Sequence, residues 1–122
     1  MVDMKFLVKS MNIVMNTEYF NKLIGQRLRF LGTYDGAVKL YNGQYRVCFI
    51  NVREVSSHKK FRKHVNILCP ESVYLHCFEN ALGNKFQFTA ELYNYTKKPY
   101  KGIYYRTWSV GLRDIRKLEQ MR

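Results

Sequence analysis

Residues 37–55, AVKLYNGQYRVCFINVREV, contain the clearest evidence on the fold of this chain. The dipeptide Asn42-Gly43 is typical of a tight β-hairpin, because both residues accept a positive φ at low steric cost. The residues on either side, 37–41 and 44–55, are rich in β-branched and aromatic side chains, which favour extended backbone. The segment therefore predicts a hairpin whose second strand is long.

Further strands are expected on both sides of this hairpin. Before it, residues from 26 onward read as a first strand that Asp35-Gly36 kinks by a turn or bulge. After it, the expected strands are 64–68 (HVNIL), 85–95 (KFQFTAELYNY) and 107–115 (TWSVGLRDI). Pro70 ends the first of these three, and Ser72 then caps a helix through residue 80, with Gly83 at its exit. The predicted order is β-β-β-α-β-β.

The N-terminal residues 1–25 are expected to form a helical arm, which could cover the bottom of the barrel or build a dimer interface. Apolar residues in 4–15 recur at helical spacing, although a strand over 6–14 is an alternative. Asn16 and Thr17 offer an N-cap for a short helix that Gly25 would end. If the arm were instead a strand, the chain would form a six-stranded mixed sheet.

This order of elements resembles the oligonucleotide/oligosaccharide-binding (OB) fold, a five-stranded Greek-key β-barrel. The resemblance covers residues 26–118 and depends on element order, the kinked first strand and the segment GNKFQFTAELYNY (83–95). That segment looks like the fold's helix-exit glycine followed by its fourth strand. The resemblance implies a mainly β barrel domain over 26–118, with a tail at 119–122.

The charge of the chain indicates a polyanionic partner. Its 122 residues include 21 Lys and Arg against 9 Asp and Glu, a net charge of +12, and 16% of them are aromatic. A phosphate backbone would relieve the self-repulsion of so much positive charge, whereas solubility alone does not require it. An anionic membrane surface is not favoured, because neither a long basic amphipathic helix nor a lipidation signal is evident.

Cysteine content and the first residues predict a reducing, cytoplasmic location. Cys48, Cys69 and Cys77 are odd in number and lack the spacing of a disulfide framework. The apolar start of the chain is interrupted by Lys9 and Asn12 and has no small-residue cleavage site, unlike a secretion signal. No stretch is long enough for a membrane span.

The OB resemblance implies a ligand across the second and third strands, clasped by the loops between strands one and two and strands four and five. The residues assigned to nucleic-acid binding are Tyr34, Lys39 and Tyr41; Phe49, Asn51 and Arg53; Lys59, Lys60, Arg62 and Lys63; and Tyr95, Lys97, Lys98, Tyr100, Lys101, Tyr104, Tyr105 and Arg106. In the last group tyrosines alternate with cations, a composition that suits unpaired bases on a phosphate backbone. Packing is the alternative for each tyrosine, and a core position is the alternative for Phe49; Trp108 is expected in the core.

Metal and catalytic chemistry are not expected. Cys69, His76 and Cys77, with His64 before them, lack a C-x-x-C pair, so buried thiols are preferred to a zinc site and no cofactor is assigned. The acidic residues are scattered, and no glycine-rich phosphate loop is present. A nuclease on this barrel would have to bring Asp35, Glu54 and Arg113 together.

The leading hypothesis is therefore non-catalytic binding of single-stranded nucleic acid, with DNA favoured over RNA. The resemblance implies similarity to single-stranded DNA-binding proteins of phage or mobile-element replication and recombination, with a homodimer or a replication protein as a further partner. The alternatives are a protein-interaction module whose basic face binds an acidic partner, and a nuclease.

Overall fold

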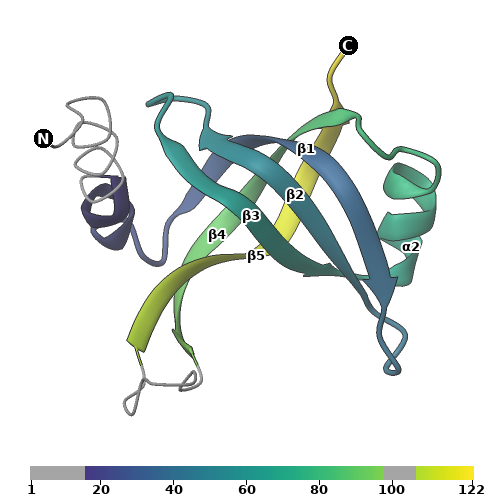
Figure 1. The fold of residues 1–122 in the computed structure, drawn as a ribbon, viewed down its shortest axis with the longest axis horizontal. Helices are drawn as coiled ribbons and strands as arrows, with labels where there is room; N and C mark the ends of the chain where they lie inside the picture. Colours follow the sequence, from purple (N-terminus) through teal and green to yellow (C-terminus); the bar gives the residue numbers. More distant parts are fainter. Residues whose placement is uncertain (1–15, 98–106) are drawn as a thin grey trace, which may run out of the picture.

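Five antiparallel strands form one sheet in this computed structural model, which describes residues 16–97 and 107–122 (Figure 1). The strands are β1 (Arg27–Lys39), β2 (Tyr45–Glu54), β3 (Lys60–Cys69), β4 (Lys85–Lys97) and β5 (Thr107–Gln120). Between β3 and β4, one α-helical turn, α2 (Glu71–Val73), continues into a π-helical turn, η1 (Tyr74–Phe78). The predicted mainly β class and the order β-β-β-α-β-β are confirmed.

The sheet is open between its two edge strands. Hydrogen-bonded ladders give the order β3-β2-β1-β4-β5, and no ladder joins β3 to β5 within the described residues. The sheet is strongly twisted (Figure 1), so the two edges still approach each other. Arg62 on β3 donates a hydrogen bond to Ser109 Oγ on β5 at 2.6 Å. The closed Greek-key barrel remains a prediction.

The first hairpin and the kink of the first strand form as the sequence predicts. Gly43 has φ 89°, and Asn42 Oδ1 accepts a hydrogen bond from the Gln44 backbone N–H at 3.0 Å. In β1 the register against β2 shifts between Tyr34 and Ala37, and Gly36 has φ 114°. A positive φ of this size is easily adopted only by glycine, so these residues determine both features locally.

Several predicted boundaries are wrong. The third strand begins at Lys60 rather than at residue 64, because the long β2 offers the basic run a ladder partner as far as Arg53. The predicted helix ends at Phe78 rather than at residue 80, and β5 continues to Gln120 rather than ending at residue 115. Residue 16 already lies in the helical segment 16–21, so neither Asn16 nor Thr17 is the N-cap.

The core is built mainly from phenylalanine. Phe49 of β2 packs on Phe88 of β4, with ring centroids 4.7 Å apart, and η1 adds Phe78 at one end of the sheet. Phe20, from the short helical segment 16–21, is 2% exposed and meets Phe61 edge to face, so this segment belongs to the same core.

The alternative strand over 6–14 and the Trp108 side chain lie outside the described part. None of the helices in that part is long and apolar enough to cross a membrane.

Candidate nucleic-acid interface

Tyr34 and Phe49, which the sequence analysis assigns to the ligand surface, lie in the core. They are 4% and 0% exposed. The Tyr34 ring stacks on Phe78 of η1 at a centroid distance of 5.0 Å, and Phe49 packs on Phe88. The predicted base-stacking role of both rings is wrong, because η1 and β4 cover them.

A β-bulge in β2 explains the error at Phe49. Simple alternation places Phe49, Asn51 and Arg53 on one face, but Asn51 has φ 54° and the register against β1 shifts beside it. After the bulge, Val52 and Glu54 are the buried residues. Asn51 and Arg53 are therefore exposed on the other face from Phe49.

The other two predicted residues of the first loop, Lys39 and Tyr41, are exposed to solvent. Tyr41 is fully exposed at the tip of the hairpin. Lys39 lies at the end of β1 and pairs with Glu71 at 3.5 Å. Because both groups of this ion pair are about half exposed, it contributes little to stability and leaves the lysine accessible.

The predicted basic group between strands two and three is divided by the structure. Lys59 lies over the ring of Tyr19, with Nζ 5.2 Å from the centroid, and Lys60 and Lys63 are exposed on β3. Arg62 is half buried and reaches towards β4 and β5. Among the described residues, Arg62 reaches Tyr95 of the predicted interface with its side chain, and Lys60 pairs with Arg53 in the β2–β3 ladder.

The last predicted group begins on β4. Tyr95 is a half-buried residue of this strand, and the backbone of Lys97 ends it. The remaining members of the group, which are Lys98, Tyr100, Lys101, Tyr104, Tyr105 and Arg106, lie outside the described residues. Their assignment stays a prediction.

Tyr93 and Tyr95, here called the tyrosine pair, lie side by side on the outer face of the β4–β5 ladder. Their ring centroids are 5.8 Å apart, and they project opposite to the buried Leu92. Gly111 of β5 makes room for them: a Cβ there would lie 2.9 Å from the Tyr93 ring and 3.0 Å from the Tyr95 ring. Tyr93 and Gly111 were not among the residues predicted from the sequence, although Tyr93 shares the alternation phase of Tyr95 in KFQFTAELYNY.

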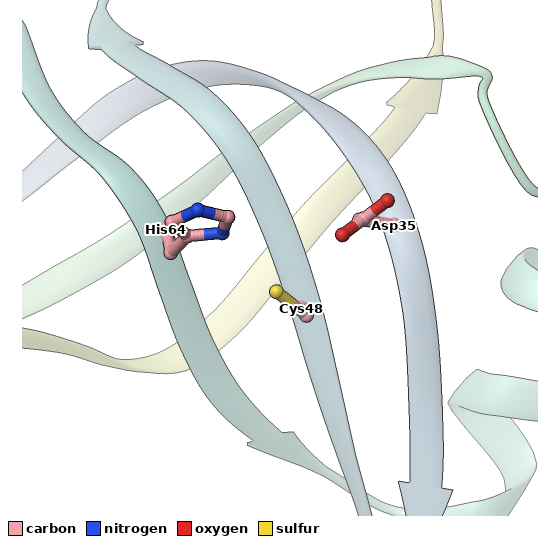
Figure 2. Close-up of side chains that lie close together, drawn as sticks. All are labelled: Asp35, Cys48 and His64. Carbon is pink, nitrogen blue, oxygen red and sulfur yellow. The ribbon is translucent and has the colours of Figure 1, made fainter.

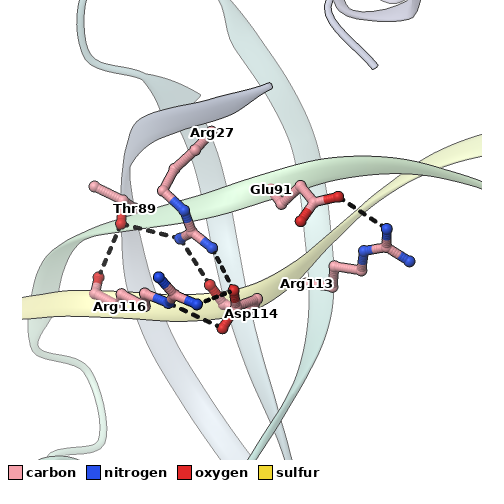
Figure 3. Close-up of polar contacts among 6 residues, drawn as sticks. All are labelled: Arg27, Thr89, Glu91, Arg113, Asp114 and Arg116. Atoms are coloured by element: carbon pink, nitrogen blue, oxygen red, sulfur yellow. Dashed lines mark hydrogen bonds and ion pairs between the residues drawn. The ribbon is translucent and has the colours of Figure 1, made fainter. Parts of the chain in front are cut away.

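An arginine holds each ring of the tyrosine pair. The Arg113 guanidinium lies 5.0 Å from the centroid of Tyr93 and pairs with Glu91 at 2.8 Å, as Figure 3 shows for the ion pair. Arg62 crosses from β3 and donates hydrogen bonds to the Tyr95 hydroxyl at 3.2 Å and to Ser109 Oγ. The site thus combines two half-exposed aromatic rings with two cations.

Next to this site, a second arginine network fixes β1 against β5. Arg27 donates to Thr89 Oγ1, to the Asp114 carbonyl oxygen and to the Asp114 carboxylate at 2.6 Å, and Arg116 pairs with the same carboxylate (Figure 3). Asp114 has φ 55°, which marks an irregular point in β5. The network positions β5 and therefore Gly111 and Arg113.

A different cluster lies on the outer face of β1, β2 and β3. Asp35, Cys48 and His64 each offer one ligand atom, and these three atoms all lie within 4.8 Å of one another (Figure 2). Burial raises the pKa of the Cys48 thiol, Asp35 raises it further, and Arg46 offsets part of the rise. A thiol with a raised pKa is a poor nucleophile at neutral pH.

The residues considered in the sequence for a zinc site or a nuclease site have different surroundings in the structure. Cys69 is buried, and burial, with a smaller contribution from Cys77, raises the pKa of its thiol to about 11. The three residues that a nuclease would bring together have different partners. Glu54 is buried and accepts hydrogen bonds from three hydroxyls, while Arg113 pairs with Glu91. Asp35 lies instead in the outer cluster with Cys48.

The chain matches no protein-family model, no curated protein and no solved structure. Its own residues and their geometry are therefore the basis for a functional conclusion.

Proposed function

We propose that this protein binds single-stranded nucleic acid, DNA in preference to RNA, without reacting with it. The tyrosine pair and its two arginines form the described part of the interface, and the prediction that Lys98, Tyr100, Lys101, Tyr104, Tyr105 and Arg106 also take part is kept in this proposal. The observation that carries this proposal is the pair of rings laid side by side over Gly111, each held by a cation.

Side-by-side rings on a strand suit unpaired bases. Aromatic rings stack with bases of any sequence, because every base has a π-face, and each such contact contributes about 1–3 kcal/mol. Neighbouring bases in a duplex already stack on each other, so a single strand gains more from this surface. Arg62 and Arg113 would add attraction to the phosphates, which carry most of the salt-dependent affinity.

The arrangement of the sheet also supports an OB-type barrel as the host of this surface. The order β3-β2-β1-β4-β5 becomes a closed barrel if the edge strands β3 and β5 meet. Arg62 bridges these two strands, and the helical segment between β3 and β4 packs Phe78 against one end of the core. The loop between β4 and β5 would then border the ligand.

Fluorescence anisotropy with labelled oligo-dT, oligo-U and a duplex of equal length tests the proposal. We expect oligo-dT to bind more tightly than the duplex, and its log affinity to fall with log salt by about 0.7 per neutralised phosphate. Tyr93→Leu and Tyr95→Leu should each cost about 1–3 kcal/mol of binding, whereas Tyr93→Phe keeps the ring and the affinity.

Tyr74→Leu is the matched control for loss of a tyrosine. Tyr74 is half buried and stacks on Tyr45, with centroids 3.9 Å apart, away from the β4–β5 ladder. The proposal would be contradicted if Tyr93→Leu and Tyr95→Leu bound oligo-dT as tightly as the wild type. Equal affinity of the wild type for single strand and duplex would also contradict it. Capture of an acidic protein that survives nuclease treatment, without oligonucleotide binding, would favour the protein-interaction alternative.

A further inference from the structure

We propose that Asp35, Cys48 and His64 form a zinc site on the outer face of β1, β2 and β3. Zinc would take one oxygen, one sulfur and one nitrogen from the protein, and its fourth position would be open to solvent. This inference does not depend on nucleic-acid binding, because none of the three residues belongs to the tyrosine pair or to the two arginines that hold it.

Adjacent strands bring the three side chains together. Cys48 lies on β2, the strand between β3 and β1, and it stands between buried Val47 and Phe49, so its thiol faces outward. His64 projects from β3 on one side, and Asp35 projects from the bulge of β1 on the other (Figure 2). The ligand atoms, within 4.8 Å of one another, need to approach by only about 1 Å to surround one ion at bond lengths of about 2.0–2.3 Å.

The three side chains are available for such a movement. Within residues 16–97 and 107–122, the side chains of Asp35 and His64 make neither a hydrogen bond nor an ion pair, and both residues are exposed. In the same described part of the chain, the single hydrogen bond of the Cys48 thiol is a long one, which it donates to the carbonyl oxygen of Phe49 at 3.9 Å. Small rotations of χ1 and χ2 would therefore break no strong interaction.

The donor set selects zinc among the common divalent ions. Magnesium and calcium prefer sites made wholly of oxygen, whereas thiolate and imidazole favour zinc. A thiolate and a carboxylate together neutralise the ion, which matters on a chain with net charge +12. Arg46 lies two positions from Cys48 on β2, and its positive charge would repel a bare zinc ion. Because the thiolate and the carboxylate neutralise the bound ion, this repulsion is removed.

A catalytic cysteine triad is the other chemistry that these residue types suggest. In such a triad the imidazole lies between the thiol and the carboxylate and hydrogen-bonds both. Here the cysteine lies in the middle, on β2, with the histidine on β3 to one side and the carboxylate on β1 to the other. No hydrogen bond joins any two of these described residues. The arrangement converges on a shared point, which suits a metal ion.

Titration of the metal-free, full-length protein with cobalt(II) tests the site. Cobalt(II) replaces zinc in tetrahedral sites, and a bound thiolate gives a charge-transfer band in the near ultraviolet. We expect this band in the wild type, displaced by zinc, and no band in Cys48→Ser. Asp35→Asn and His64→Gln should weaken cobalt binding by at least about tenfold, since even loss of an outer-sphere partner costs that much.

Cys77→Ser and His76→Gln are the matched controls, because they remove the same ligand types elsewhere. They should keep the band, and all variants should keep the wild-type circular dichroism. Zinc at about 100 times its Kd should raise the Tm of the wild type by roughly 5–10 °C and leave that of Cys48→Ser unchanged. No band in the wild type, a band that survives Cys48→Ser, or a band lost in Cys77→Ser would overturn the proposal.

Discussion

Glu54 is a carboxylate with only 3% exposure at the end of β2. It accepts hydrogen bonds from the hydroxyls of Tyr19 at 3.0 Å, Ser56 at 2.9 Å and Ser57 at 2.6 Å. These bonds replace the water that burial removes, and they attach the N-terminal helical segment to the β2–β3 connector. Glu54 thus joins three segments of the chain through its hydrogen bonds.

Glu54→Leu should lower the free energy of unfolding by about 2–4 kcal/mol, because it leaves three hydroxyls without their acceptor. Tyr19→Phe removes one of the three bonds and should cost about 1 kcal/mol. Urea unfolding measures both. A Glu54→Leu variant as stable as Tyr19→Phe would show that the three hydroxyls find other partners.

Gly111→Ala should reduce oligonucleotide affinity more than stability. The new Cβ would meet the edges of the Tyr93 and Tyr95 rings at 2.9 and 3.0 Å, and half-exposed rings can tilt away at a cost of about 1 kcal/mol. The tilt breaks the side-by-side surface, so binding should weaken by at least about 1 kcal/mol.

Gly32→Ala is the control for this prediction. Its Cβ would approach Val52 at 3.1 Å and Phe49 at 3.2 Å inside the core, where nothing can tilt into solvent. It should cost about 1–3 kcal/mol of stability and leave the binding of the folded protein unchanged. Anisotropy and urea unfolding on both variants separate the two effects.

At the scale of one element, the bulge in β2 depends on Asn51. Its φ of 54° lies in the left-handed region, which asparagine tolerates and β-branched residues do not. Asn51→Val should therefore destabilise the protein by about 1–2 kcal/mol, and Asn51→Gly should be neutral. Asn66→Val, at an exposed position of β3 paired with Cys48, is the control and should change little in urea unfolding.

Arg62 of β3 links this edge strand to the opposite end of the sheet, with one hydrogen bond to Ser109 Oγ of β5 and one to the Tyr95 hydroxyl of β4. Arg62→Lys should not restore this link, because one ammonium group cannot reproduce the fixed geometry of a guanidinium. We expect both Arg62→Lys and Arg62→Gln to speed amide hydrogen exchange in β5 near Ser109. Arg29→Gln, an exposed arginine of β1, should not; equal exchange in all variants would show that the edges are held by other contacts.

For the whole molecule, the burial of one thiol and two phenol groups in their protonated, neutral form predicts a loss of stability at alkaline pH. Burial raises the pKa of Cys69 from 9.0 to about 11, and it raises the pKa values of Tyr34 and Tyr19 above 10.0, with Glu54 also contributing for Tyr19. Since the folded state holds these groups protonated, their stabilisation is complete below the unfolded pKa values and is lost as pH rises through the folded ones.

Urea unfolding from about pH 8 to about pH 11 should show this loss, with about 2–3 kcal/mol due to Cys69. Cys69→Ala should be less stable at neutral pH because of the cavity, but its stability should fall less steeply between about pH 9 and pH 11. Parallel curves for the two proteins would mean that Cys69 ionises normally in the folded state.

The sequence by itself determined the local features: the Asn42-Gly43 hairpin, the kink at Asp35-Gly36, the order of strands and helix, and the large positive charge. The hairpin, the kink and the order of elements follow from φ preferences and from the alternation of side chains, which act between neighbours in the chain. The charge follows from composition alone. They were enough to predict a mainly β fold and a polyanionic ligand.

Only the tertiary structure decided which side chains meet. One bulge at Asn51 changed the face of every later residue in β2, and the ladder with β2 turned a basic connector into strand β3. Gly111 lies beside Tyr93 and Tyr95, and Cys48 beside Asp35 and His64, because strands pair across distances at which sequence patterns carry no register. Register and bulges arise from packing of the whole sheet, so the sites they create could not be read from the chain alone.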